Sequence, residues 1–251
     1  MRRGALCLLL RCQIKAWPEH KGLCKVAAEV RILFGSSSIA DIDDEIAEYR
    51  KTADAGDMEL QCNLGTCYMR GLGVAINKRE AFKWYKRAAE TGYTLAQFNV
   101  AVCYDQGDGI AIDNCEAFRW YKHAAEAGHL VSQYNLGNMY KYGIGVAIDT
   151  SESLKWYKLA ALKGNAGAQC CLGYCYIQGH GIAVDKREGL KWVRRAAEQG
   201  HAYSQHNLGV CYENGDGVVR DMKEADKWYA LAIKSGFVKH EAVEHEAVAR
   251  I

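Results

Sequence analysis

The fold is decided by a stretch that recurs along the chain, and its clearest copy is residues 134–164, which read YNLGNMYKYGIGVAIDTSESLKWYKLAALKG. The same pattern occurs five times at intervals of 36 residues, without insertion or deletion between copies. One tryptophan marks each copy: Trp84, Trp120, Trp156, Trp192 and Trp228. A fixed period of this length predicts a solenoid in which each unit packs only against its neighbours. We therefore expect function to lie on a repeated surface.

The first half of each copy predicts a helix with one packed side. At about 100° per residue, the positions that share a sector are, in the first copy, Gln61, Leu64, Gly65 and Tyr68. The glycine lets a partner helix approach closely, and its equivalents are Ala101, Gly137, Gly173 and Gly209. We expect the helix to end at Gly71, because glycine adopts the left-handed conformation of a helix C-terminus at little cost.

The second half predicts a second helix that buries aromatic and small side chains. The residue before this helix has a side chain that can accept the amide hydrogens of the first turn. In successive copies this residue is Asn77, Asp113, Asp149, Asp185 and Asp221. The positions with helical spacing are, in the first copy, Ala81, Trp84, Tyr85, Ala88 and Ala89. We interpret the tryptophans as structural core, with the alanines allowing close contact. A glycine, Gly92 in the first copy, follows the helix.

The repeats divide the chain into five units at residues 58–93, 94–129, 130–165, 166–201 and 202–237. Residues 36–57 are predicted to form a half repeat that caps the array, because residues 41–57 match a second helix in register. Residues 1–35 form a poorly defined basic segment, in which 23–34 fit a degenerate first helix. Residues 238–251 are short and charged, and predict a C-terminal capping helix.

The residues from Tyr134 to Gly164 resemble the SEL-1-like repeat (SLR) family. The resemblance covers residues 58–237 and implies an all-α fold, a right-handed αα-superhelix of helix-turn-helix repeats similar to tetratricopeptide arrays. It is less specific for activity, because one fold hosts many roles. Members of the family mostly serve as adaptors in signalling, in endoplasmic-reticulum-associated degradation, or as enzyme activators. The resemblance therefore implies a non-enzymatic scaffold that binds proteins.

An alternative comes from bacterial cysteine-rich relatives, which have been credited with β-lactam binding and hydrolysis. Those relatives join each helix pair by a disulfide between cysteines about eight residues apart. Here Ala75 stands at that spacing from Cys67, and Ala183 from Cys175. This chain departs from their pattern, which places the hydrolase hypothesis second.

Charge and hydropathy exclude several classes of protein. The formal net charge is +2, of which residues 1–35 carry +5 and the remainder −3. A mildly acidic body lacks the basic stripe that binding of nucleic acid needs. No apolar run reaches the length of about 20 residues that spans a membrane. We expect a cytoplasmic monomer, with a secretory or organellar location as the alternative if the acid-free first 18 residues are a targeting signal.

The cysteines and histidines, which could bind metals or take part in catalysis, are better explained by structural roles. One repeat position is occupied by Cys67, Cys103, Cys175 and Cys211, with Met139 in the remaining copy. Packed helices lie about 8 to 10 Å apart, beyond the reach of a disulfide of about 7 Å, so we expect these thiols to be reduced. His240 and His245 are five residues apart, whereas a zincin helix needs four. We expect no catalytic residue, metal, cofactor or small-molecule substrate.

A partner should bind where the copies differ. The side of the first helix opposite the packed sector lines a concave groove, by similarity to tetratricopeptide arrays. In the first copy it carries Glu59, Cys62, Asn63, Thr66 and Arg70. The later copies place there Phe98, Val102, Tyr134, Asn138, Cys170, Tyr174, Val210 and His206, with Tyr142, Gln178 and Asn214 at the end of the helix. Tyrosine is a favoured interface anchor. We expect this strip to bind a protein or peptide.

One polar position on the first helices has two interpretations. Asparagine occupies it in four copies, as Asn63, Asn99, Asn135 and Asn207, and Cys171 interrupts the series. The amides can tie neighbouring backbones together or contact a ligand, and we favour the structural role.

Overall fold

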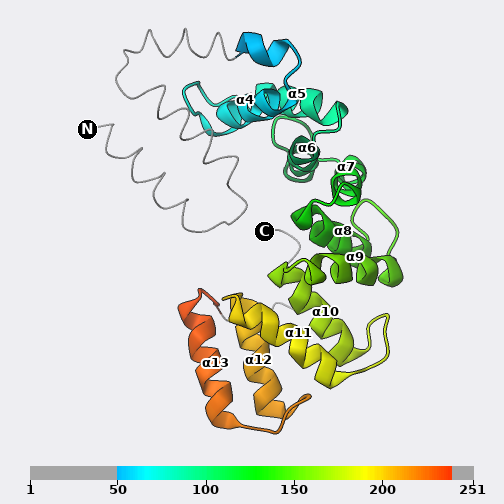
Figure 1. Cartoon of the computed structure of the whole chain (residues 1–251), viewed down its shortest axis with the longest axis vertical. Helices are drawn as coiled ribbons and strands as arrows, with labels where there is room; N and C mark the ends of the chain where they lie inside the picture. The colour runs from blue at the N-terminus through cyan, green and yellow to red at the C-terminus, as the bar shows by residue number, and fades with distance from the viewer. Residues whose placement is uncertain (1–49, 239–251) are drawn as a thin grey trace, which may run out of the picture. The chain divides into compact units, whose positions relative to one another are not determined.

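A computed structural model describes residues 50–238, and this part of the chain is helical with no strand. The helices that follow residues 50–54 have 13 residues each: α4 (Met58–Arg70), α5 (Lys78–Glu90), α6 (Thr94–Gln106), α7 (Asn114–Glu126), α8 (Leu130–Tyr142), α9 (Thr150–Leu162), α10 (Ala166–Gln178), α11 (Lys186–Glu198), α12 (Ala202–Asn214) and α13 (Met222–Lys234). Even-numbered helices are the first helices of their repeats, and odd-numbered helices are the second (Figure 1).

The described residues form two compact units. One holds the chain up to Ala96 together with Asp108–Ile110, and the other holds Gln97–Gly107 and the residues from Ala111 onward. In the first unit α4 packs against α5. In the second, α8 packs against α9, α10 against α11 and α12 against α13, and each second helix also packs against the next first helix. Within the second unit, the last three repeats are therefore helix pairs, each in contact with the repeat before it.

Helix ends are set by side chains and glycines. The caps predicted for the second helices are confirmed, because Asn77, Asp113, Asp149, Asp185 and Asp221 each accept a first-turn amide. The predicted left-handed glycine ends α4, α8, α10 and α12, at Gly71, Gly143, Gly179 and Gly215. The caps of the first helices were not predicted. They are Asp57, His129, Asn165 and His201.

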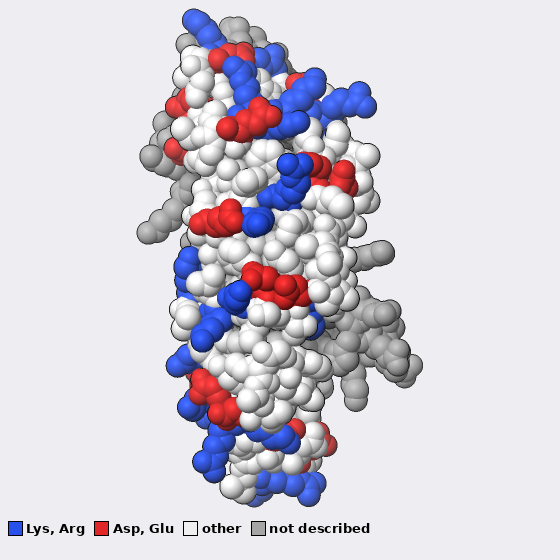
Figure 2. All heavy atoms as spheres, turned by 90° about the vertical axis from the view of Figure 1, so that its right-hand side faces the viewer, with Lys and Arg blue, Asp and Glu red and all other residues white. Residues whose placement is uncertain are grey.

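Charged residues concentrate on the second helices. A glutamate in the first turn pairs with a lysine or arginine three residues later in each of them: Glu80–Lys83, Glu116–Arg119, Glu152–Lys155, Glu188–Lys191 and Glu224–Lys227. Exposed pairs of this kind contribute little to stability but keep a surface hydrated. On the face drawn in Figure 2, positive and negative side chains are interspersed. That face shows no large field of one sign for a polyanion to bind.

Within a repeat, the two helices meet at the predicted glycine. A Cβ atom added at Gly137 would lie 2.6 Å from Cδ1 of Tyr157, and the pairs Gly65–Tyr85 and Gly209–Tyr229 have the same distance. In the fourth repeat, Val193 replaces the tyrosine and Gly189 replaces an alanine. Ile177 packs against Gly189 there, since a Cβ atom added at this glycine would lie 2.6 Å from Cγ1 of the isoleucine. The smaller side chains are thus offset by an isoleucine, and the packing of this repeat is preserved.

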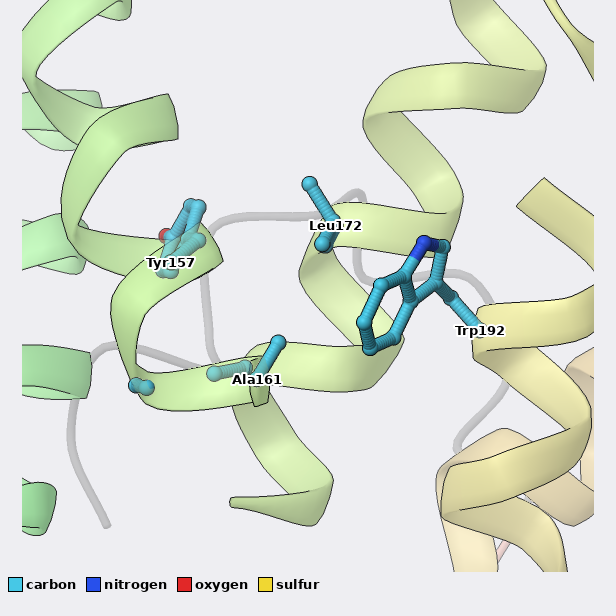
Figure 3. Packing of buried hydrophobic residues seen from close by; sticks show 6 residues of the cluster. Tyr157, Ala161, Leu172 and Trp192 are labelled. Atoms are coloured by element: carbon cyan, nitrogen blue, oxygen red, sulfur yellow. The ribbon is translucent and has the colours of Figure 1, made fainter. Parts of the chain in front are cut away.

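Between repeats, apolar side chains of three helices form a shared core. Tyr157 and Ala161 from α9 pack with Leu172 from α10 and Trp192 from α11. Figure 3 shows the Trp192 indole beside Leu172. Trp84 and Trp192 are buried, whereas Trp120, Trp156 and Trp228 are half-buried. The tryptophans therefore contribute to the core, as predicted, but not equally.

In the second unit, a buried glutamine joins α7 to α8, α9 to α10 and α11 to α12. Nε2 of Gln133 donates to the carbonyl of Ala125 at 3.0 Å, and Gln169 and Gln205 donate to Ala161 and Ala197 at 3.1 Å. In the first unit, Gln61 makes the same bond to Ala53 at 2.9 Å. We name these bonds the glutamine latch. Sequence periodicity placed Gln61 on the packed side of its helix but did not reveal this bond.

The start of the described chain follows the repeat pattern. Residues 50–54 are helical, Ala53 is fully buried and Gly56 has a φ of 111°, as in the last turn of a second helix. The predictions for residues 1–35, for most of 36–57 and for nearly all of 238–251 lie outside the described residues.

The second glycine of the turns after α6, α8, α10 and α12 contacts the start of the preceding second helix. Gly145 has a φ of 68°, and a Cβ atom there would lie 2.0 Å from the carbonyl oxygen of Asn114 at the start of α7. Gly164 also has a positive φ, 94°, but no atom lies within 4 Å of its Cβ position. The two glycines differ in their surroundings rather than in the sign of φ.

We predict that Gly145→Ala destabilises the protein more than Gly164→Ala. Both changes incur left-handed strain of about 1 to 2 kcal/mol, but only the first forces two repeats apart, at a further cost of about 1 to 3 kcal/mol. Urea unfolding followed by circular dichroism measures the difference. Equal losses of stability would show that this contact between repeats is unimportant.

Candidate binding surface on the first helices

The first helices of the last three repeats are nearly uncharged. Helix α10 has no charged side chain, α8 has only Lys141, and α12 has only Glu213. The second helices contrast with them, since α11 reads KREGLKWVRRAAE. Glu213 is already engaged, because its Oε2 accepts the hydroxyl of Tyr229 at 2.5 Å. Depletion of charge together with enrichment in tyrosine is typical of the core of a protein interface.

One repeat position of the predicted surface packs largely against other residues of the chain. Its residues include Phe98, Tyr134 and His206. The Phe98 ring lies 4.5 Å from that of His129, centroid to centroid, and 6.1 Å from that of Tyr121. Tyr134 lies 6.2 Å from Tyr157, and burial raises the pKa of its hydroxyl to about 12. His206 stacks on Phe237 at 4.2 Å. Phe98, Tyr134 and His206 are therefore half-buried, by the second helix of their own repeat or by an aromatic side chain at its end.

The position four residues later, whose residues include Val102, Asn138 and Tyr174, is partly in contact with the core. Oδ1 of Asn138 accepts the Tyr157 hydroxyl at 2.6 Å. Val102 packs against a core cluster that includes Tyr121, while Tyr174 remains half-exposed.

The exposure expected for three positions of this side was wrong. Cys62, Thr66 and Cys170 are buried. Thr66 accepts the Tyr85 hydroxyl at 3.1 Å, because the second-helix tyrosine reaches across to this side of the first helix.

The most accessible part of the strip lies at the end of the first helices. Gln178 and Asn214 are exposed, and Tyr142 is half-exposed. Nζ of Lys141 lies 4.8 Å from the ring centroid of Tyr142 and 5.7 Å from that of Tyr174. Tyr174 also stacks on His180 at 5.4 Å. The structure thus brings Tyr142 and Tyr174 together around one cation.

Tyr203, at the start of α12, belongs to the same neighbourhood and was missed in the sequence. Its side chain is 40% exposed. Burial raises the pKa of its hydroxyl, with smaller contributions from Cys170, Tyr142 and Tyr174. Tyr203 occupies the helical position of Glu59, so the spacing argument applied to every copy would have found it. We name Lys141, Tyr142, Tyr174 and Tyr203 the tyrosine–lysine cluster.

The asparagines are engaged in contacts between repeats. The Asn135 side chain bonds to the Tyr121 hydroxyl, and Nδ2 of Asn207 donates to Sγ of Cys170 at 3.6 Å. The partners of these two amides are side chains, so the expectation that they tie backbones together was wrong in detail. Asn135 and Asn207 nevertheless connect successive repeats, in accordance with a structural role.

The shared cysteine position is a packing site. Cys67, Cys103, Cys175 and Cys211 are buried and form no disulfide, and Met139 is buried in the remaining copy. Burial raises the pKa of Cys67 and Cys211 to about 11, which disfavours the reactive thiolate. Between residues 50 and 238 we find no group of three or more potential metal ligands. None of the helices in that range could cross a bilayer.

The repeats match the family model of the Sel1 repeat at residues 59–93, 94–129, 130–165, 166–201 and 202–237. The chain belongs to the Sel1 repeat family. This confirms the resemblance found in the sequence and the all-α repeat fold that it implied. No curated protein matches the chain.

Solved structures of other Sel1 repeat proteins resemble this one. A Sel1 repeat protein from Oxalobacter formigenes is 35% identical, with a TM-score of 0.69 over 72% of this chain and 75% of that one. A protective antigen of uropathogenic Escherichia coli, c5321, which displays an SLR fold, is 30% identical with a TM-score of 0.76. That match covers 91% of this chain and 49% of c5321. The immunity protein Pa5087 of Pseudomonas aeruginosa, at 17% identity and a TM-score of 0.50 over 89% and 85% of the chains, shows the fold alone.

Two Sel1 repeats begin their first helix with a neutral histidine. Nδ1 of His129 accepts the amide of Ser132 at 3.2 Å, and His201 accepts that of Ser204 at 3.3 Å. Burial lowers the pKa of His129 to about 4 and also lowers that of His201. A protonated ring cannot accept these bonds, so the caps require the neutral form.

We predict that acid weakens these caps. As the pH falls from about 6.5 to about 4, the unfolded chain protonates His129 while the folded chain does not, so stability is lost over this range. We expect a loss of about 1 to 2 kcal/mol, given the partial exposure of the ring. Thermal unfolding at pH 7 and pH 4.5 measures it.

The matched control is the variant His129→Asn/His201→Asn, because Asn165 caps α10 in the same way without titrating. The variant should lose less stability than the wild type between the two pH values. An identical loss would mean that other groups cause the acid sensitivity.

Proposed function

We propose that this chain is a non-enzymatic scaffold that binds a segment of another protein on the first helices α8, α10 and α12. The observation that carries the proposal is the contrast between these nearly uncharged, tyrosine-bearing helices and their charged neighbours. The stability of the fold does not require this contrast, because the side chains of the tyrosine–lysine cluster lie at the edge of the core. Tyrosine offers a large contact area at a small cost in conformational entropy, which suits a binding anchor.

The setting of the scaffold is also part of the proposal. None of the described cysteines forms a disulfide, which supports a thiol-reducing compartment such as the cytoplasm. In that setting the scaffold would serve as an adaptor in signalling or protein quality control. The described cysteines do not form the helix-pair disulfides of the cysteine-rich relatives, so the β-lactam hydrolase alternative gains no support from them. The similar solved structures include an antigen and an immunity protein, and neither assigns a partner to this chain.

We predict that Tyr142→Ala/Tyr174→Ala reduces binding of protein partners by about tenfold or more, because it removes two interface anchors. Affinity purification with quantitative mass spectrometry compares this variant with the wild type. The helical circular-dichroism signal should stay unchanged, since neither side chain is part of a fully buried cluster.

Leu159→Ala/Leu162→Ala is the matched control. These leucines are 44% and 65% exposed on the second helix α9, so they are apolar and accessible but lie outside the proposed surface. Partners lost with the tyrosines should be retained with this control. Undiminished capture by the tyrosine variant, or equal losses in both variants, would contradict the assignment.

A further inference from the structure

Lys141 is a cation at a position where the repeat does not need one. The equivalent residues of the other first helices are Met69, Asp105, Ile177 and Glu213. Two of them are apolar and two are acidic, so neither packing nor the register of the repeats accounts for a lysine. The position is free to vary, and in the third repeat it carries the only Lys or Arg of α8, α10 and α12.

Lys141 has no carboxylate partner within residues 50–238. Its ammonium group lies over the rings of Tyr142 and Tyr174. Burial acts to lower the pKa of Lys141, but a hydrogen bond to Tyr142, with contributions from Cys171 and Cys175, raises it on balance. The carboxylate of Glu213 is bonded to Tyr229. The Asp105 carboxylate lies close enough to Tyr121 to influence its pKa. The half-buried cation is therefore held by aromatic faces and keeps its charge available.

The surroundings of Lys141 favour an acidic ligand. An ammonium over a tyrosine face is stabilised by the ring quadrupole but retains donors for further hydrogen bonds. A bound segment would exclude water from the cluster, and attraction between Lys141 and a carboxylate would then be stronger than in solvent. Because α10 has no charged side chain, no acid on that helix competes for the lysine.

We propose that the tyrosine–lysine cluster binds a protein segment in which one Asp or Glu side chain pairs with Lys141. Apolar or aromatic residues on either side of that acid pack against Tyr142, Tyr174 and Tyr203. The inference rests on the proposed function and adds the chemistry of the partner. It concerns an acidic side chain within the segment and not a free chain terminus.

The test is selection of random peptides displayed on phage, with their C-termini fused to the coat protein, against the purified full chain. Selected peptides are then synthesised with amidated C-termini and measured by fluorescence anisotropy. We expect enrichment of one Asp or Glu between apolar residues. Changing that acid to its amide should weaken binding about tenfold. The same change should have little effect on binding to the Lys141→Gln variant.

Three further variants make the result specific. Lys141→Glu should select peptides with Lys or Arg in place of the acid, and Lys141→Arg should keep the acidic preference. Lys158→Gln, which removes an exposed cation of α9, should bind the acidic peptides as the wild type does. Circular dichroism checks that each variant is folded.

The outcomes separate this inference from the proposed function. Peptides that require Tyr142 and Tyr174 but show no acidic preference, or that bind Lys141→Gln and Lys141→Glu unchanged, would overturn the acidic partner and leave the scaffold intact. Failure to select any peptide that depends on the two tyrosines would overturn both.

Discussion

The arrangement of the repeats depends on the glutamine latch. In each latch, the side-chain amide of a first-helix glutamine donates a hydrogen bond to the carbonyl of an alanine in the last turn of the preceding second helix. Both groups are buried away from water. A buried amide without an acceptor costs about 1 to 3 kcal/mol, so the bond is strongly specified once the helices pack. The latch also explains why alanine occupies the acceptor position, because a larger side chain at Ala125, Ala161 or Ala197 would hold the next helix away. These alanines are 1% exposed, and the constant repeat length keeps the donor and the acceptor in register.

This constraint determines where the copies are free to differ. The glutamine, the alanine and the close contact between glycine and tyrosine occupy the inner sides of the helices, so variation is confined to their outer parts. On the second helices that freedom is used for hydrated ion pairs. On α8, α10 and α12 it is used for tyrosines, amides and a single lysine. The same scaffold thus presents one surface suited to solvent and another suited to a partner.

Much of the fold could be predicted from the sequence, because the decisive features are local and repeated. The caps at Asp149 and Asp185 and the left-handed Gly143 follow from side-chain chemistry at fixed spacing. The histidine caps did not, because histidine accepts an amide only when it is neutral, a state that depends on burial in the fold. Exposure on the candidate surface was harder to predict, since the contacts of Phe98 and His206 come from His129 and Phe237, about 30 residues later at the end of the same repeat. The sequence pattern singled out Tyr142 and Tyr174, whereas the position of Lys141 over their rings depends on the geometry of the fold.

The substituted fourth repeat bears on how such arrays evolve and can be engineered. Val193, Gly189 and Ile177 fill together the volume that a tyrosine and an alanine fill elsewhere, and the α10 and α11 backbones come close at Gly173. A consensus tyrosine restored at position 193 alone would have to fit its ring where the Gly189 carbonyl oxygen lies only 2.8 Å from the Cβ position of Gly173. These positions therefore form a coupled set, and grafting or shuffling of modules would have to exchange them as a group.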